Sequence, residues 1–152
     1  MLRISRLTDY ATVILASLSG GSLASAADLA ERTQIGVPTV SKLLKELQHA
    51  GLVTSVRGAH GGYQLARPAA AINAAEIIDA VEGPLALTEC AGGAGNCGIE
   101  ATCLVGHGWQ RISRAIRRAL VDVSLEELVR RDKPFATPDL TRTGGATARA
   151  RG

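Results

Sequence analysis

The residues best suited to chemistry in this sequence are its three cysteines, which all fall in one short segment. Cys90, Cys97 and Cys103 are separated by six and by five residues, and His107 follows the last of them by four. Gly, Ala and Asn dominate the stretch after Cys90, which predicts a loop up to about residue 101. Thiolates and imidazole are strong donors to transition metals, so the segment is typical of a metal site.

Two kinds of metal centre fit this donor set. Iron–sulfur clusters are held by cysteine thiolates, in some proteins together with histidine. A closed zinc site uses three cysteines and one histidine. The spacing alone does not separate the two. Unligated structural cysteines are a third interpretation, which is disfavoured because every cysteine of the chain falls in the same Gly-rich loop.

The composition predicts a cytosolic protein made mostly of helices. Of its 152 residues, 46% are hydrophobic but only 3% are aromatic, so Leu, Ile, Val and Ala must form the core, which suits packed helices. No apolar run approaches the roughly 20 residues that span a membrane. Asp9, Tyr10 and Thr12 interrupt the N-terminal stretch that could otherwise resemble a signal peptide. The odd cysteine count argues against a closed set of disulfides, as expected where thiols stay reduced.

The net charge of +3 does not by itself indicate a nucleic-acid partner. Residues 1–80 carry seven Lys and Arg against six Asp and Glu, so the two signs nearly cancel. A DNA-binding function must therefore rest on where the charges lie along the predicted elements.

The first half of the chain has the pattern of a helix-turn-helix. Helices are expected over residues 6–18, 26–33 and 38 to about 50, with serine N-caps before the first two. A short turn containing Gly joins the last two helices, as in DNA-binding helix pairs. An ordinary amphipathic helix with a solvated polar face is the alternative for the third. Its apolar stripe is Val40, Leu43, Leu44 and Leu47, and its polar residues are Thr39, Ser41, Lys42, Lys45 and Gln48.

A Gly-rich hairpin follows directly. Residues 52–56 and 62–66 have the composition of short strands, and Arg57 and His60 lie among the glycines between them. A hairpin after a recognition helix is typical of a wing. Glycine lets the backbone of such a tip approach DNA closely, and narrow minor grooves attract arginine. A plain hairpin turn without a ligand is the alternative.

The rest of the chain predicts a helix over 74–82, a long helix from about 105 to 122 and a short one ending near residue 131. In the long helix, Trp109, Ile112, Ile116 and Leu120 recur at helical spacing, while four arginines lie mainly off that line and are expected to form a solvated face. The apolar stripe either packs on the chain's own core or pairs with a second copy. Two copies are favoured because helix-turn-helix proteins usually bind two half-sites about 34 Å apart.

These expectations divide the chain into four parts. The fold is mostly α with a small β-hairpin, a winged helix-turn-helix followed by a long dimerisation helix. Residues 1–82 form the DNA-binding domain, 83–104 the cysteine loop, and 105–131 the dimerisation helix with a short C-terminal helix. The tail, 132–152, is rich in Thr, Gly, Ala and Arg and is expected to be disordered.

Four features of the chain together resemble one family. They are the helix pair, the hairpin VTSVRGAHGGYQLAR that follows it, the three-cysteine loop, and the segment CLVGHGW that runs into a long helix. The family is the Rrf2 family of iron–sulfur winged-helix regulators, and the likeness covers roughly residues 1–131. Within that family, the sequence is most similar to the group that regulates the SUF iron–sulfur assembly operon. The resemblance implies a dimeric cytoplasmic transcription factor, most simply a repressor, that binds operator DNA and senses cluster status to control cluster assembly genes.

The resemblance also implies site residues. Cys90, Cys97 and Cys103 would hold a [2Fe–2S] or [4Fe–4S] cluster together with a fourth ligand. In the IscR group that ligand is a histidine three positions after the third cysteine, where this sequence has Gly106, and His107 comes one residue later. In the NsrR group an aspartate of the partner's first helix serves, and Asp9 matches it. Another ligand, such as a small thiol or water, is the remaining alternative. The family's DNA contacts correspond to Thr39, Ser41 and Lys42 in the recognition helix and Arg57 in the wing, with Lys45 and His60 as candidate phosphate contacts.

Two other classes of function stay open at this point. One is a zinc-stabilised winged-helix DNA-binding protein whose metal carries no signal. The other is a ferredoxin-like electron carrier, which the helix-turn-helix and the wing argue against. An enzyme is not expected, because the sequence shows no paired carboxylates, no nucleophile triad and no phosphate-binding loop.

Overall fold

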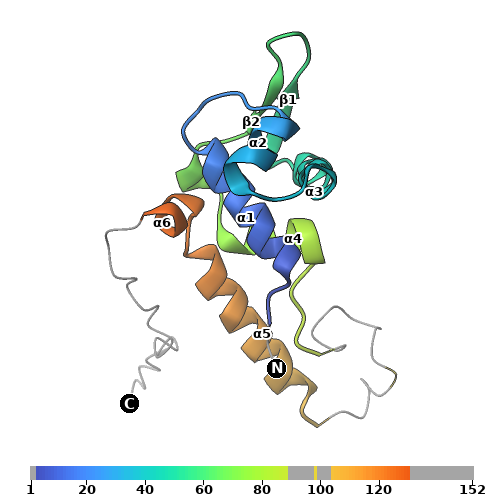
Figure 1. Cartoon of the computed structure of the whole chain (residues 1–152). Coiled ribbons are helices and arrows are strands. Elements are labelled where there is room, and N and C mark those ends of the chain that lie inside the picture. The colour runs from blue at the N-terminus through green and yellow to red at the C-terminus, as the bar shows by residue number, and fades with distance from the viewer. Residues whose placement is uncertain (1–2, 89–97, 99–103, 131–152) are drawn as a thin grey trace, which may run out of the picture.

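The computed structural model describes residues 3–88, 98 and 104–130. The described part is mostly helical with a two-stranded antiparallel hairpin, which confirms the expected fold class. The hairpin projects from one end of the molecule, and α5 runs away from the body at the other end (Figure 1). The elements are α1 (Arg6–Leu18), α2 (Ala26–Thr33), α3 (Val37–His49), β1 (Val53–Val56), β2 (Gly62–Leu65), the 3-10 helix η1 (Ala69–Ala71), α4 (Ala74–Glu82), α5 (Gly106–Val121) and α6 (Leu125–Val129).

Helix starts lie where local capping predicts them. The Ser5 hydroxyl accepts a hydrogen bond from the backbone N–H of Thr8 and caps α1. Ser25, Asn73 and Ser124 each form a reciprocal capping box with the acidic residue three positions later. Such boxes satisfy backbone donors that a helix start otherwise leaves without partners. The observed boundaries therefore differ from the predicted ones by only one or two residues.

One core lies between the first four helices and the hairpin. The predicted stripe of α3 is confirmed, since Val40, Leu43, Leu44 and Leu47 all have 0% exposure. Burying each such leucine contributes roughly 1.5–3 kcal/mol. Leu125 of α6 is equally buried and belongs to the same core, although it lies far along the chain.

Two short pairings hold the periphery together and were not expected from the sequence. Ala24, before α2, forms an isolated antiparallel bridge with Tyr63 of β2 and so ties this loop to the hairpin. Asn73 and Ser124 form a second bridge, which joins the start of α4 to the α5–α6 junction. Among the described residues no helix is long and apolar enough to cross a membrane.

Candidate nucleic-acid interface

The exposed face of α3 is basic. Lys42, Lys45 and His49 are all exposed, and their spacing of three and four residues places them in one row opposite the buried stripe. Thr39 and Ser41 are half-buried and lie on the flanks of this row. A row of basic side chains along a helix can contact the phosphates that border a DNA groove.

Most of the charge of Lys42 remains available to a ligand. Its Nζ lies 3.8 Å from Oε1 of Glu46, and the two side chains are 64% and 31% exposed. An exposed pair four residues apart in a helix contributes only about 0.3–0.5 kcal/mol. DNA phosphates can therefore compete for this lysine at little cost.

The wing lies next to this face and is braced against it. Gln48 Nε2, in the last turn of α3, donates to Ser55 Oγ of β1 at 3.1 Å. At the tip, Arg57 and His60 are exposed, as a ligand-contacting tip requires. Gly58 has a φ of +122°, which disfavours any residue with a side chain.

The tip is closed by Gly61. A Cβ on Gly61 would lie 2.1 Å from the carbonyl oxygen of Val56. No side chain fits there, so the glycines that the sequence places in the tip are required by the turn itself. The tip thus presents backbone, one arginine and one histidine to whatever the wing meets.

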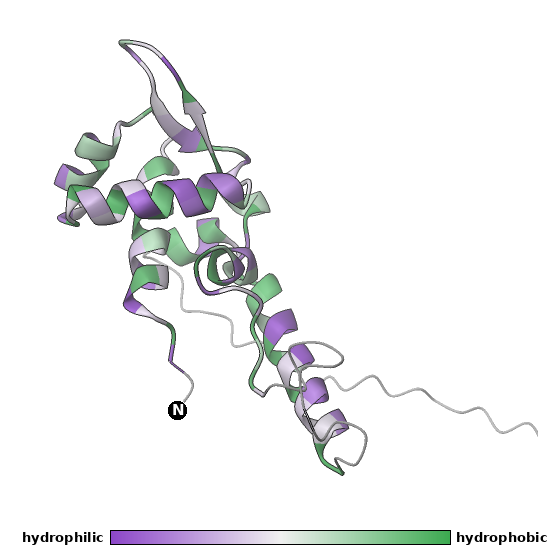
Figure 2. Ribbon diagram, turned by 90° about the vertical axis from the view of Figure 1, so that its right-hand side faces the viewer, coloured by the Kyte–Doolittle hydropathy of each residue, from purple (hydrophilic) through white to green (hydrophobic). Residues whose placement is uncertain are grey.

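The apolar stripe of α5 is only partly covered by the chain itself. Ile116 and Leu120 are half-buried, but Trp109 is 41% exposed and Ile112 is 46% exposed. Ser113 is the buried side chain on the side that faces the body. Hydrophobic and hydrophilic residues alternate along this helix where it leaves the body (Figure 2). The chain's own core therefore does not account for the stripe.

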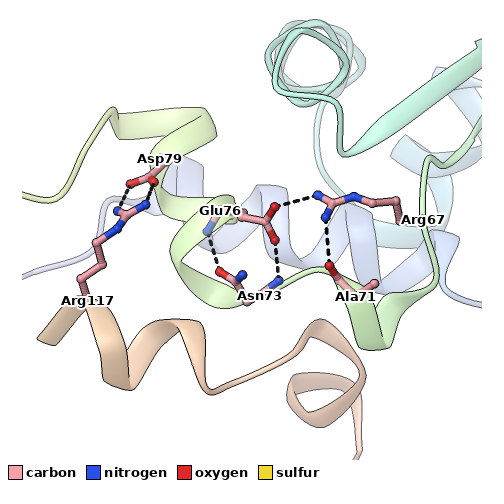
Figure 3. A network of polar contacts seen from close by, with 6 residues as sticks. All are labelled: Arg67, Ala71, Asn73, Glu76, Asp79 and Arg117. Carbon is pink, nitrogen blue, oxygen red and sulfur yellow. Dashed lines mark hydrogen bonds and ion pairs between the residues drawn. The ribbon is translucent and has the colours of Figure 1, made fainter. Parts of the chain in front are cut away.

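The four arginines of α5 do not share one environment. Arg111, Arg114 and Arg118 are exposed, in keeping with a solvated face. Arg117 instead forms a bidentate ion pair with Asp79 of α4, with N–O distances of 3.0 and 2.6 Å (Figure 3). The hydrogen bonds to Asp79 and its negative charge raise the pKa of Arg117. Arg117 is exposed like the other three, as expected, but among the described residues it is the one of the four that also pairs with a carboxylate.

The three candidate cysteine ligands, Cys90, Cys97 and Cys103, lie outside the described residues. Both candidates for the fourth ligand are described. Asp9 is exposed in the first turn of α1, and His107 is exposed in the first turn of α5. Within the described ranges, no three His, Cys, Asp or Glu side chains are grouped to hold a metal ion.

The first turn of α5 shows how position 106, where the IscR group has its histidine, differs from position 107, where this chain has one. Gly106 is buried while His107, the next residue, is exposed. Successive side chains of a helix point about 100° apart. Since both residues already belong to the helix, His107 faces a different direction from a side chain at position 106.

Two features of this surface were not singled out in the sequence. His49 completes the basic row of α3, and its spacing from Lys42 and Lys45 was the signal that could have identified it. The Arg117–Asp79 pair joins two helices that are far apart in sequence, and periodicity within either helix gives no sign of it.

A helix-turn-helix with an exposed basic face and a Gly-tipped wing defines the winged-helix class of DNA-binding proteins. Within that class, the family model of Rrf2, the iron-dependent transcriptional regulators, matches residues 4–131, and the chain belongs to this family. The family consists of transcriptional regulators, which is a non-enzymatic class.

Relatives agree with this placement. The chain is 34% identical over 138 residues to the regulator IscR of Cereibacter sphaeroides, covering 86% of this chain and 89% of that protein. It is 43% identical over 107 residues to the ORF2 protein of Azotobacter vinelandii, covering 70% of this chain and 65% of that protein, just under two thirds of its length.

Solved structures show the same fold. CymR, the global cysteine regulator of B. subtilis, superposes with a TM-score of 0.65 at 32% identity, covering 85% of this chain and 97% of that one. The T. potens IscR gives a TM-score of 0.61 at 30% identity, covering 84% and 86%.

Proposed function

We propose that this protein is a homodimeric transcriptional repressor that senses iron–sulfur cluster status and controls genes for cluster assembly, most simply a SUF operon. The observation that carries the proposal is the exposed row of Lys42, Lys45 and His49 on α3, placed beside a wing whose tip carries Arg57. The relatives named IscR support the iron–sulfur part of the proposal. The protein would act in the cytoplasm, where operator DNA is found.

In this function α3 enters the major groove of the operator. Thr39, Ser41 and Lys42 lie in the N-terminal half of α3, and the N-terminal residues of a recognition helix contact base edges. Lys45 and His60 contact phosphates, and Arg57 enters the adjacent minor groove at the wing tip. The Gln48–Ser55 hydrogen bond keeps the wing in a fixed orientation to α3, so both elements dock as one unit.

A second copy of the chain covers the exposed stripe of α5. Trp109 and Ile112 present large apolar surface that the chain itself leaves open, and aromatic anchors of this kind are enriched in protein interfaces. A two-fold dimer would place two α3 helices for two half-sites, which a palindromic operator matches.

The donor set of the cysteine segment fits an iron–sulfur cluster. Cys90, Cys97 and Cys103 would hold the cluster, with His107 or the partner subunit's Asp9 as the fourth ligand. Such a cluster supplies an iron centre whose stability depends on its ligands and on solvent access. His107 and Asp9 are both exposed and in first turns, so either side chain is free to reach outward.

The first experiment is an absorption spectrum of the protein purified without oxygen, with iron and sulfide assayed on the same sample. We expect bands between about 320 and 600 nm and matched iron and sulfide, as cysteine-held clusters give. A colourless protein with one zinc per chain would contradict cluster sensing and leave a structural metal. If the protein is colourless and metal-free, the same assay after reconstitution with iron and sulfide decides, and failure to take up a cluster counts against the proposal.

The second experiment links the cluster to DNA. Cys97→Ala and wild type are compared for binding to DNA selected by the wild-type protein from random duplexes. We expect the variant to lose affinity or to change its sequence preference. Unchanged affinity and preference would leave no role for the cluster in regulation.

A further inference from the structure

The position of α5 on the body is fixed at its C-terminal end by backbone pairing. The N–H of Ala74 donates to the carbonyl of Val123 at 2.9 Å, and the N–H of Leu125 donates to the carbonyl of Ile72 at 2.7 Å. These bonds form a point of attachment just beyond the last residue of the helix. Backbone bonds at a single point locate the end of a helix but leave its tilt open.

The Arg117–Asp79 pair provides a second attachment, about one turn inside the helix. It uses the two terminal guanidinium nitrogens, Nη1 and Nη2, and both carboxylate oxygens (Figure 3). A bidentate pair of this kind constrains direction as well as distance, because the guanidinium fork is planar. Within the part of the chain that the structure describes, no other ion pair joins α5 to another element.

The helix that carries Asp79 also holds the base of the wing. Glu76, three residues earlier in α4, accepts a hydrogen bond from Arg67 Nη2 at 2.7 Å. Arg67 lies two residues after the end of β2, and its Nη1 donates to the carbonyl of Ala71 at 3.0 Å (Figure 3). α4 is therefore tied by ion pairs to the wing on one side and to α5 on the other.

Geometry makes the tilt of α5 matter. The helix has 16 residues, so it is about 24 Å long, and a tilt of about 10° at its anchored end moves its other end by about 4 Å. That displacement is close to the rise of one base pair, about 3.4 Å. In a dimer that pairs through α5, the same tilt changes the separation of the two recognition helices.

We propose that the Arg117–Asp79 pair is a positioning strut, which holds the tilt of α5 on the winged-helix body and so sets the half-site spacing that the dimer accepts. The inference rests on the proposed DNA-binding dimer. Neither residue contacts DNA in this proposal, since α5 leaves the body at the end opposite the wing (Figure 1). The pair acts through the placement of α3.

The test measures spacing preference. Wild-type protein first selects its half-site from random duplexes. Two inverted copies of that half-site are then placed in a library with every spacer up to about one helical turn, about 10 base pairs. The quantity measured is the ratio of binding at the best spacer to binding at spacers one base pair longer or shorter, for wild type and for Arg117→Ala.

We expect a sharp optimum for wild type and a flatter one for Arg117→Ala. A half-exposed ion pair limits the size of the effect, so the ratio should fall by about two- to fivefold. Asp79→Asn, which keeps the shape of the side chain, should flatten the optimum in the same way. The exchanged pair, Asp79→Arg with Arg117→Asp, should restore a sharp optimum.

The matched control is Arg118→Ala. It removes the same charge from the next residue of the same helix, and Arg118 has no carboxylate within ion-pair distance among the described residues. Both alanine variants lose one positive charge from the same helix, so charge loss alone affects their overall DNA affinity alike, and the preferred spacing is what distinguishes them. Arg118→Ala should keep the wild-type optimum.

Each remaining outcome is decisive. An unchanged optimum in Arg117→Ala would overturn the strut while leaving the proposed function intact. Sedimentation of Arg117→Ala as a monomer would also overturn it, because the pair lies within one chain. If wild type selects no DNA at all, the proposed function itself fails, and the strut fails with it.

Discussion

Gly62 allows the wing to lie against the body. Replacing it with alanine should push the wing away from the backbone of Ala24. A Cβ at this position would lie 2.8 Å from the carbonyl carbon and oxygen of Ala24 and 3.1 Å from its nitrogen. These atoms are backbone, so no rotamer change relieves the contact. The neighbouring Tyr63 forms both hydrogen bonds of the Ala24 bridge, at 2.8 and 3.1 Å, and the bridge must move if Ala24 moves.

The loss in the free energy of unfolding that Gly62→Ala should cause has two contributions. Forcing a methyl group into a filled space costs about 1–3 kcal/mol, and weakening two backbone hydrogen bonds adds up to about 0.5–1.5 kcal/mol each. Gly62→Ala should therefore lower the free energy of unfolding by about 2–4 kcal/mol when the bridge is partly retained. At about 4 °C per kcal/mol, the Tm should fall by about 8–16 °C.

Urea and thermal unfolding followed by circular dichroism measure this loss. The control is Gly20→Ala, because a Cβ on Gly20 meets nothing within 4 Å and its φ is not positive. That variant should remain within about 0.5 kcal/mol of wild type. If Gly62→Ala is as stable as Gly20→Ala, the close packing of the wing on Ala24 does not hold in solution.

Three further predictions concern DNA, assembly and pH. Lys45→Ala should weaken binding to all duplexes alike and reduce the slope of log affinity against log salt by about one, measured by fluorescence anisotropy, whereas Arg118→Ala should leave the slope unchanged. Ile112→Asp should sediment as a monomer, while Val37→Asp, at a similarly exposed valine of α3, should remain dimeric; two monomers or two dimers would refute pairing through α5. Hydrogen bonds from the Thr8 hydroxyl and the Ser5 N–H lower the pKa of Glu82, so its contribution to stability is present above the unfolded pKa of about 4.3 and is lost as pH falls through the folded value. The stability difference between wild type and Glu82→Gln should thus shrink between about pH 5 and pH 3, and a constant difference would contradict it.

Local signals in the sequence predicted most of the fold. Ser25, Asn73 and Ser124 cap their helices through contacts three residues away, so their effect can be read from a short window. The apolar stripe of α3 repeats over several turns and predicted its buried face correctly. The bridge between Ala24 and Tyr63 involves one residue on each side, which is too short for any periodicity, so no local pattern predicts it.

The candidate site divides in the same way. Exposure of Lys42 and Lys45 follows from helical spacing against the buried stripe, and the structure agrees with it. The Arg117–Asp79 pair depends on how α4 and α5 cross, which periodicity within each helix does not determine. The roles of Cys90, Cys97 and Cys103 remain predictions from residue type and spacing.

The burial of Leu125 has a consequence for the order of events during synthesis. Its side chain has 0% exposure and belongs to the same core as α1 and α3, so that core cannot be completed until residue 125 has left the ribosome. All three cysteines precede it in the chain. Since chains are made from the N-terminus at about 5–20 residues per second, every nascent molecule exposes its thiols before its DNA-binding fold is finished. If the cysteines hold a metal as proposed, a newly made chain can therefore bind it before its DNA-binding fold is complete.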